Sequence, residues 1–157
     1  MGRAVAGAVL DCVLHSVTDP SLAPPGKTTL SVYSQYSPYR LRTGSWDDRK
    51  EEVGDTILET LASFAPNLRG AVERREVLSP LDMEREWGLP AGCIYQIDMT
   101  PDQLFSLRPL PGWSSYRTPV SGLYLCGSSA HPGGGVTGAP GRNAAMVVLE
   151  DFRTASG

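Results

Sequence analysis

The stretch GLYLCG (122–127), SSAHPGGGVTGAPG (128–141) and RNAAMVVL (142–149) decides the fold of this 157-residue chain. Its pattern predicts a short apolar strand bounded by glycines, then a glycine-rich loop, then a helix. The helix is apolar on almost every side, and a helix of that kind is buried in a folded protein. We therefore expect a buried C-terminal helix with a special backbone loop at its start.

Within the loop, Gly133, Gly135 and Gly138 spell GxGxxG. In dinucleotide folds such glycines let the backbone approach a pyrophosphate, which sits at the helix N-terminus. The complete fingerprint also needs a second strand with an acidic residue about 20 positions further on. The sequence ends 19 residues after Gly138, so we expect no complete Rossmann half. No Gly-Lys-Ser/Thr follows either, which excludes a P-loop. What remains is an anion site made of backbone amides, or a tight turn without a ligand.

Composition and charge narrow the partners. The formal net charge is −3 and the pI is near 5.3, which leaves no electrostatic footprint for nucleic acid. No apolar run reaches the roughly 18 residues that a membrane span requires. The three cysteines are odd in number and far apart, with no CxxC pair. They indicate a reducing compartment, so we expect a cytoplasmic protein, or a mitochondrial matrix protein if the source is eukaryotic.

Patterns elsewhere predict the remaining elements. Valines at every fourth position predict a helix over 4–17, and β-branched and aromatic residues predict a strand over 28–36. Ser45 can cap a helix that Pro66 ends, and Ser79 can cap a second, short one. The predicted order is helix 4–17, loop 19–26, strand 28–36, turn 37–44, helix 45–65, strand 72–78, helix 80–87, an irregular segment 89–118, strand 122–127 and the C-terminal helix.

His131 is the one further candidate for chemistry. As a metal ligand it has no partner, because His15 is remote and Cys126 alone does not make a site. As a general base it has no acidic residue to orient it. The alternative is that His131 holds the loop by hydrogen bonds. A serine hydrolase is excluded because no GxSxG is present. The sequence therefore predicts no metal site and leaves catalytic residues unknown.

The C-terminal block resembles a known family. Residues 122–127, 131–136 and 141–145 resemble the C-terminal flavin motif of the phytoene desaturase and retinol saturase group of FAD-dependent oxidoreductases. Within the group, the resemblance is strongest to a branch named for a pyridine nucleotide-disulfide oxidoreductase domain. It extends over roughly residues 10–155, and its further matches are 19–26, 35–46, 65–66, 75–76, 103–105 and 108–109.

The resemblance implies a fold and a cofactor. The fold class is α/β (α+β in isolation): a C-terminal fragment of a two-domain, Rossmann-like FAD/NAD(P)-binding flavoprotein that lacks the N-terminal βαβ unit. Residues 1–118 would be the end of the substrate-binding domain with a connector, and 119–157 the C-terminal strand, loop and helix of the FAD-binding domain. The residues that the resemblance places against FAD are Gly127, Ser128, His131, Gly133, Gly134, Gly135, Val136 and Thr137.

Three functions stay open at this point. The first is the C-terminal part of a flavoenzyme that transfers a hydride to or from FAD. The protein would supply one side of the site, and the missing N-terminal portion would be its partner. The second is a non-catalytic, truncated homologue that acts as an oligomeric or interaction protein through its exposed face. The third is a module that binds an anion or phosphate at the helix N-terminus.

Overall fold

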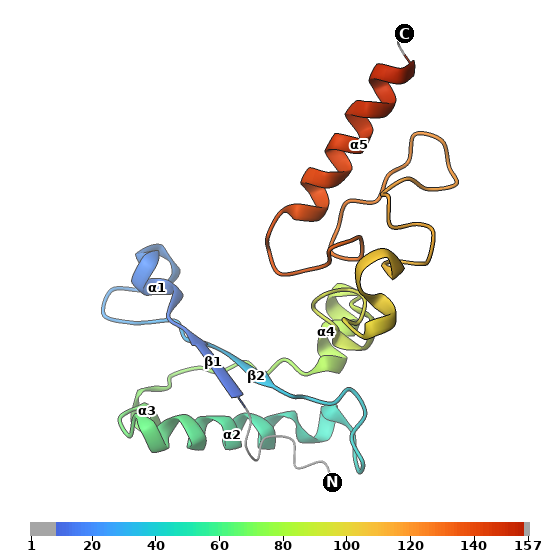
Figure 1. Cartoon of the computed structure of the whole chain (residues 1–157). Helices are drawn as coiled ribbons and strands as arrows, with labels where there is room; N and C mark the ends of the chain where they lie inside the picture. Colours follow the sequence, from blue (N-terminus) through green and yellow to red (C-terminus); the bar gives the residue numbers. More distant parts are fainter. Residues whose placement is uncertain (1–8, 156–157) are drawn as a thin grey trace. The chain divides into compact units, whose positions relative to one another are not determined.

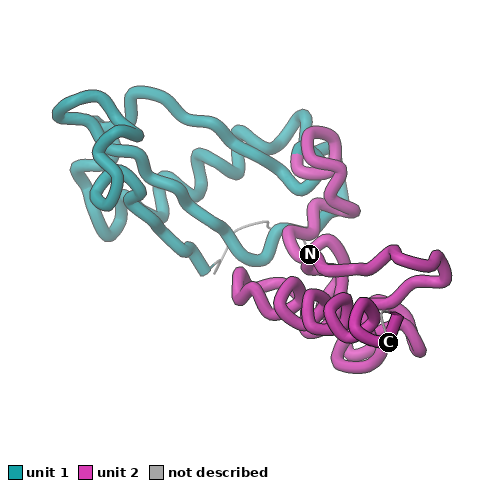
Figure 2. The backbone as a smooth tube through the Cα atoms, turned by 90° about the horizontal axis from the view of Figure 1, so that it is seen from above, with its two compact units in different colours: residues 1–82 teal, residues 83–157 magenta. Residues whose placement is uncertain are grey.

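A computed structural model of the chain describes residues 9–155. The chain divides into two compact units, residues 1–82 and 83–157, with the boundary inside helix α4 (Pro80–Trp87) (Figure 2). Each unit has its own few buried side chains. In the first these are Trp46 and Ala62, and in the second they are Tyr116, Ala130 and Ala144.

The first unit opens with an antiparallel pair of strands, β1 (Val9–Val13) and β2 (Ser31–Gln35) (Figure 1). Val9 lies opposite Gln35 and Val13 opposite Ser31. The connection holds the four-residue helix α1 (His15–Thr18) and the 3-10 turn η1 (Pro20–Leu22).

The strand predicted over 28–36 is confirmed, but the helix predicted over 4–17 is wrong for the residues that form β1. The rest of that prediction, 4–8, lies outside the described residues. A spacing of four places side chains on one face of a helix and also on one face of a strand. Valine is moreover stiff at χ1 and favours strands, which decides between the two here.

Helix α2 (Trp46–Phe64) confirms the prediction for 45–65. The Ser45 hydroxyl accepts from the backbone N–H of Asp48 at 3.3 Å, and the Asp48 carboxylate accepts from the Ser45 N–H. This reciprocal capping box satisfies donors that have no partner within the helix. The helix ends at Phe64, ahead of Pro66. Trp46 is buried, and its indole N–H is shared between the carbonyls of Pro38 and Tyr39, each at 3.1 Å.

The segment 72–78, which follows α3 (Leu68–Ala71), is extended but belongs to no strand, so the prediction of a strand there is wrong. It packs on α2 instead. Arg75 forms ion pairs with Glu51 and Asp55 of that helix. A Cβ on Gly54 would lie only 2.6 Å from Val77 Cγ2, so the helix and the segment are in close contact there.

Helix α4 confirms the capped helix predicted at residue 80. The Ser79 hydroxyl accepts from the Asp82 N–H at 3.2 Å, while the Asp82 carboxylate accepts from the Ser79 N–H at 2.8 Å. Gly88 follows the last turn with φ of +64°, the left-handed conformation that commonly ends a helix.

The second unit is irregular from Gly88 to Gly138 and then forms helix α5 (Ala139–Ala155). Its 3-10 turns are η2 (Pro90–Gly92), η3 (Pro101–Gln103) and η4 (Phe105–Leu107). The irregular segment predicted over 89–118 is confirmed. The strand predicted over 122–127 is wrong: only an isolated bridge joins Tyr124 to Arg117. A strand needs a neighbour along its length, and none is present in the part of the chain described.

Helices and one two-stranded sheet make the described chain α+β, as expected for it in isolation. The Rossmann-like sheet of the proposed larger fold and the domain boundary at 118/119 stay predictions.

Candidate functional site

The residues predicted to contact FAD form one continuous loop that leads into α5. Two tight turns begin it: the N–H of Ala130 donates to the Gly127 carbonyl at 2.9 Å, and that of Gly133 to the Ala130 carbonyl at 2.8 Å. Ala130 and Gly133 are buried, whereas residues 135–138 are exposed. The loop therefore has an anchored first half and an open second half.

The open half presents backbone donors. Gly135, Val136 and Gly138 have φ of +114°, +56° and +69°. Within residues 9–155, the backbone N–H groups of 134–137 donate to no acceptor. The Thr137 hydroxyl accepts from the Ala139 N–H at 3.2 Å, at the start of α5. Successive free N–H groups beside a helix N-terminus form a concavity that suits an anion.

The glycines of the loop are required for different reasons. A Cβ on Gly134 would lie 2.4 Å from Tyr95 Cδ1, and one on Gly133 would lie 3.1 Å from Met99 Sδ. A Cβ on Gly135 would meet only the Thr137 methyl, at 3.9 Å. Thus protein side chains already fill the space beside Gly133 and Gly134, whereas Gly135 faces open space. Sequence reasoning had assigned close approach by a ligand to Gly133 and Gly135 alike.

Arg108 anchors the first half of the loop, and the sequence interpretation missed it. The residue is fully buried. Its guanidinium donates six hydrogen bonds to five backbone carbonyls, two of them to Ser128 at 3.0 and 2.7 Å. The other four acceptors are the carbonyls of Tyr95, Ile97, Asp98 and Gln103, at 3.0–3.3 Å. The available signal was an arginine within a long irregular segment, where carbonyls lack helix or sheet partners.

Tyr116 connects the loop to α5. Its hydroxyl donates to the His131 carbonyl at 2.9 Å and accepts from the Asn143 side-chain amide at 2.9 Å. The Tyr116 ring is buried with Ala130 and Ala144, and Val147 packs against this cluster. The loop and the first two turns of α5 therefore share one small core.

His131 holds the loop through its backbone carbonyl. Its ring Nδ1 is buried and has no hydrogen-bond partner among the described residues. The interpretation that the side chain fixes the loop therefore finds no support at Nδ1, which stays available to a ligand.

A second network ties the segment before the loop to the far half of α5. Arg117 donates to the Asp151 carboxylate at 2.7 and 3.0 Å, and the Tyr124 hydroxyl donates to it at 2.8 Å. The bonds from Arg117 first, and then from Tyr124, hold the pKa of Asp151 below its ordinary value. The same contact raises the pKa of Tyr124.

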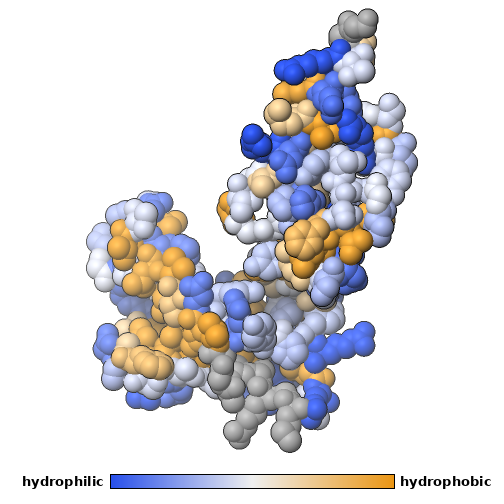
Figure 3. Space-filling model, viewed as in Figure 1, coloured by the Kyte–Doolittle hydropathy of each residue, from blue (hydrophilic) through white to orange (hydrophobic). Residues whose placement is uncertain are grey.

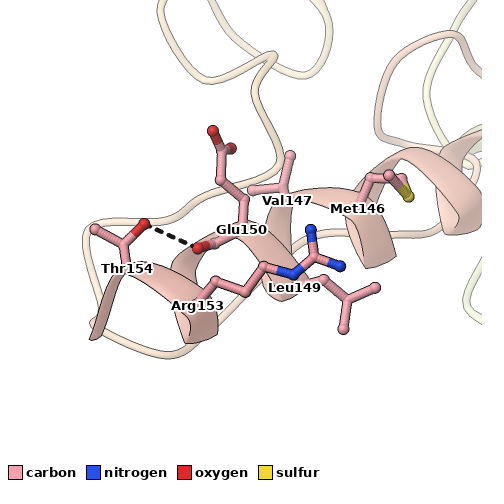
Figure 4. A pocket seen from close by; sticks show the side chains of 6 residues that line it. All are labelled: Met146, Val147, Leu149, Glu150, Arg153 and Thr154. Atoms are coloured by element: carbon pink, nitrogen blue, oxygen red, sulfur yellow. Dashed lines mark hydrogen bonds between the residues drawn. The ribbon is translucent and has the colours of Figure 1, made fainter. Parts of the chain in front are cut away.

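Helix α5 is buried on one face only, which corrects the expectation of burial all round. Pro140, Ala144 and Val147 point into the unit, whereas Met146 and Leu149 are 55% and 49% exposed. We call Ala145, Met146 and Leu149 the outer face of α5. Figure 3 shows apolar and charged residues alternating over this helix. A shallow hollow along it is lined by Met146, Val147, Leu149, Glu150, Arg153 and Thr154 (Figure 4).

Other kinds of site are not found in the described chain. Residues 9–155 contain no group of three or more His, Cys, Asp or Glu side chains placed to hold a metal ion. None of the helices described is both long and apolar enough to cross a membrane. Cys12, Cys93 and Cys126 are free thiols.

Comparison with known proteins identifies relatives. No family model and no solved structure matches the chain. It is 46% identical over 147 residues to pyridine nucleotide-disulfide oxidoreductase domain-containing protein 2 of Rattus norvegicus, covering 92% of the chain and 25% of that protein. It is 32% identical over 140 residues to a limonene dehydrogenase polypeptide of Castellaniella defragrans, covering 85% and 25%. It is 28% identical over 145 residues to the lycopene-forming phytoene desaturase of Pseudescherichia vulneris, covering 89% and 29%.

The chain thus spans about a quarter of the length of these relatives. All three names describe redox enzymes, which supports a flavin oxidoreductase family for the chain. The resemblance seen in the loop and its flanks is confirmed: the chain is a homologue of the C-terminal portion of pyridine nucleotide-disulfide oxidoreductase domain-containing protein 2 and, at lower identity, of phytoene desaturases.

Proposed function

We propose that this chain supplies one side of the FAD site of an oxidoreductase that moves a hydride to or from the flavin. The observation that carries the proposal is the row of unpaired N–H groups at 134–137, beside the N-terminus of α5. Gly127, Ser128, His131, Gly133, Gly134, Gly135, Val136 and Thr137 would hold the cofactor. FAD would supply the redox chemistry, and these residues would bind and orient it.

Two further observations fit a pyrophosphate at this loop. From Ser121 to Leu149 the chain has no Asp or Glu, so no carboxylate from that stretch repels a phosphate. The positive end of the α5 dipole favours an anion there by about 0.3–1 kcal/mol. The free Nδ1 of His131 adds one ring nitrogen that could hydrogen-bond to a ligand.

The other side of the site would come from residues that the relatives have and this chain lacks. In this proposal, 119–157 belongs to an FAD-binding domain and 1–118 to the end of a substrate-binding domain. The outer face of α5 would be covered by the rest of that FAD-binding domain. Its exposed Met146 and Leu149 then become buried, which is the usual fate of apolar residues on a helix.

FAD titration tests the proposal. The chain is titrated alone and together with the remaining portion of the rat relative supplied in trans, and the flavin absorbance bands and fluorescence are followed. Val136→Glu places a carboxylate beside the free N–H groups and is expected to weaken FAD binding by about tenfold or more. Val120→Glu is the matched control, because Val120 is also exposed but lies outside the loop.

The outcomes separate the candidates. Saturable FAD binding that Val136→Glu weakens and Val120→Glu leaves unchanged supports the proposal. Phosphate or ADP binding as tight as FAD would instead favour a simple anion module. Absence of FAD binding in both arrangements would sink the proposal.

A second candidate function is a non-catalytic interaction protein. The observation that favours it is the exposed outer face of α5, since apolar patches of this kind drive association. It predicts a dimer or larger oligomer of the chain by itself. Light scattering checks this, and a monomer at all concentrations would rule it out.

A further inference from the structure

We propose that Arg108 is the positioning residue of the FAD loop, and that it makes the segment 95–103 a structural wall of that site. The proposal rests on the proposed function for the identity of the ligand. The fixing of the loop by Arg108 is a separate claim that can be measured without FAD.

The geometry around Arg108 supports this role. The guanidinium binds four carbonyls of 95–103 on one side and the Ser128 carbonyl on the other. It therefore joins two segments that are 20 or more residues apart from each other and that form no sheet or helix together. Two of its bonds converge on Ser128, at the first turn of the FAD loop.

The chemistry of the group explains why an arginine is present. Within residues 9–155, every hydrogen-bond acceptor of Arg108 is a backbone carbonyl, and the residue is fully buried. A buried cation is stable only when its donors are satisfied. Arginine stays charged and offers five N–H donors in a rigid plane, whereas lysine offers three from a point. Five carbonyls arranged around one side chain match the planar group and not the ammonium.

Further contacts transmit this anchoring to the ligand-binding half of the loop. A Cβ on Gly133 would lie 3.5 Å from Arg108 Nε, so the guanidinium also lies against the loop backbone. The Ser129 hydroxyl donates to the Gln96 side-chain carbonyl at 3.2 Å. The Tyr95 ring lies against Gly134, which is the first residue of the row of free N–H groups. Displacing 95–103 would therefore displace the donors proposed to bind FAD.

Hydrogen exchange and chemical rescue test the role. In Arg108→Ala, the amides of Ala130 and Gly133 are expected to lose protection by about tenfold or more, as the loss of charge-assisted hydrogen bonds predicts. Amides in the last turns of α5 serve as the internal reference. Guanidinium chloride at low millimolar concentration is expected to restore protection, while sodium chloride at equal ionic strength does not. Arg153→Ala removes an exposed guanidinium from the same unit and is the matched control.

Arg108→Lys keeps the charge and tests the geometry. It is expected to behave like Arg108→Ala, with lost protection at Ala130 and Gly133. Wild-type protection in Arg108→Lys would overturn the role assigned to the planar group. If Arg108→Ala does not fold, refolding yield with and without guanidinium replaces the exchange measurement. Recovery specific to guanidinium supports the proposal, and equal loss with both salts overturns it.

FAD binding distinguishes this proposal from the proposed function. If wild type binds FAD and Arg108→Ala binds it with unchanged affinity, Arg108 does not position the site. If guanidinium restores the loop but no form of the protein binds FAD, the positioning of the loop stands and the proposed function fails.

Discussion

The ring of Tyr95 occupies the space that a side chain at position 134 would need, with Cδ1 only 2.4 Å from the place of a Cβ on Gly134. Gly134 does not have a left-handed backbone, so the glycine is required here by contact alone. Tyr95 lies in an irregular segment and Gly134 in the loop before α5, so the contact determines how two segments without regular structure fit together.

Gly134→Ala is therefore expected to destabilise the second unit by about 1–3 kcal/mol, as overpacking does. Urea unfolding followed by tryptophan fluorescence measures the change. Gly141→Ala is the matched control, because a Cβ there meets nothing within 4 Å and alanine favours the helix. The double variant Tyr95→Ala/Gly134→Ala is expected to recover part of the loss. Equal stability of Gly134→Ala and wild type would contradict the contact.

Tyr116→Phe is expected to lower the free energy of unfolding by about 1–3 kcal/mol, since it leaves the His131 carbonyl and the Asn143 amide without their partner. The ring is retained, so its packing against Ala130 and Ala144 is unchanged. Tyr36→Phe serves as the control, because Tyr36 is 89% exposed and a surface change of this kind stays within about 0.5 kcal/mol. Similar losses in both variants would show that the Tyr116 hydroxyl does not hold the loop.

The stability of the first unit is expected to fall in acid because of Asp82. Burial raises the pKa of Asp82, but hydrogen bonds from the Ser79 hydroxyl and N–H and from Lys50 outweigh it and leave the pKa below its ordinary value. The folded state then binds fewer protons than the unfolded state. The stabilisation is complete above the unfolded pKa of about 3.9 and is lost as the pH falls through the lower, folded pKa.

Unfolding measured from pH 7 to pH 2 checks this expectation. Asp82→Asn is expected to be less stable by about 1–2 kcal/mol at pH 7, as for loss of a helix cap, and to lose less on acidification. Lys50→Met removes the ion pair at 3.1 Å and is expected to shift the acid transition toward higher pH. Parallel profiles for wild type and Asp82→Asn would mean that other carboxylates govern the acid limb.

Met146→Glu together with Leu149→Glu is expected to leave the stability of the isolated chain within about 1 kcal/mol, because both side chains are exposed. The same change is expected to abolish association with the remaining portion of the rat relative, since it would bury two unpaired charges. Pull-down and light scattering measure this. Unimpaired association would exclude the outer face of α5 from the interface.

Local patterns were predictable where the chemistry is local. The two capped helices were predicted because Ser45 and Asp48, and likewise Ser79 and Asp82, satisfy each other's backbone donors within one turn. Strands were harder, because a strand depends on a neighbour that the local sequence does not contain. The valines of β1 fit a helix as well as a strand, 72–78 packs on a helix, and 122–127 makes a single bridge.

The sequence by itself determined the family and the position of the FAD loop, because glycine spacing and the flanking motif are properties of consecutive residues. Tertiary structure alone decided which glycines face protein and which face open space. It also gave Arg108 its role and showed that α5 is buried on one face only. The physical reason is that these features are contacts between residues 10 to 39 positions apart, such as Arg108 with Asp98 and Tyr95 with Gly134. The geometry of an irregular chain, and not any local pattern, brings such residues together.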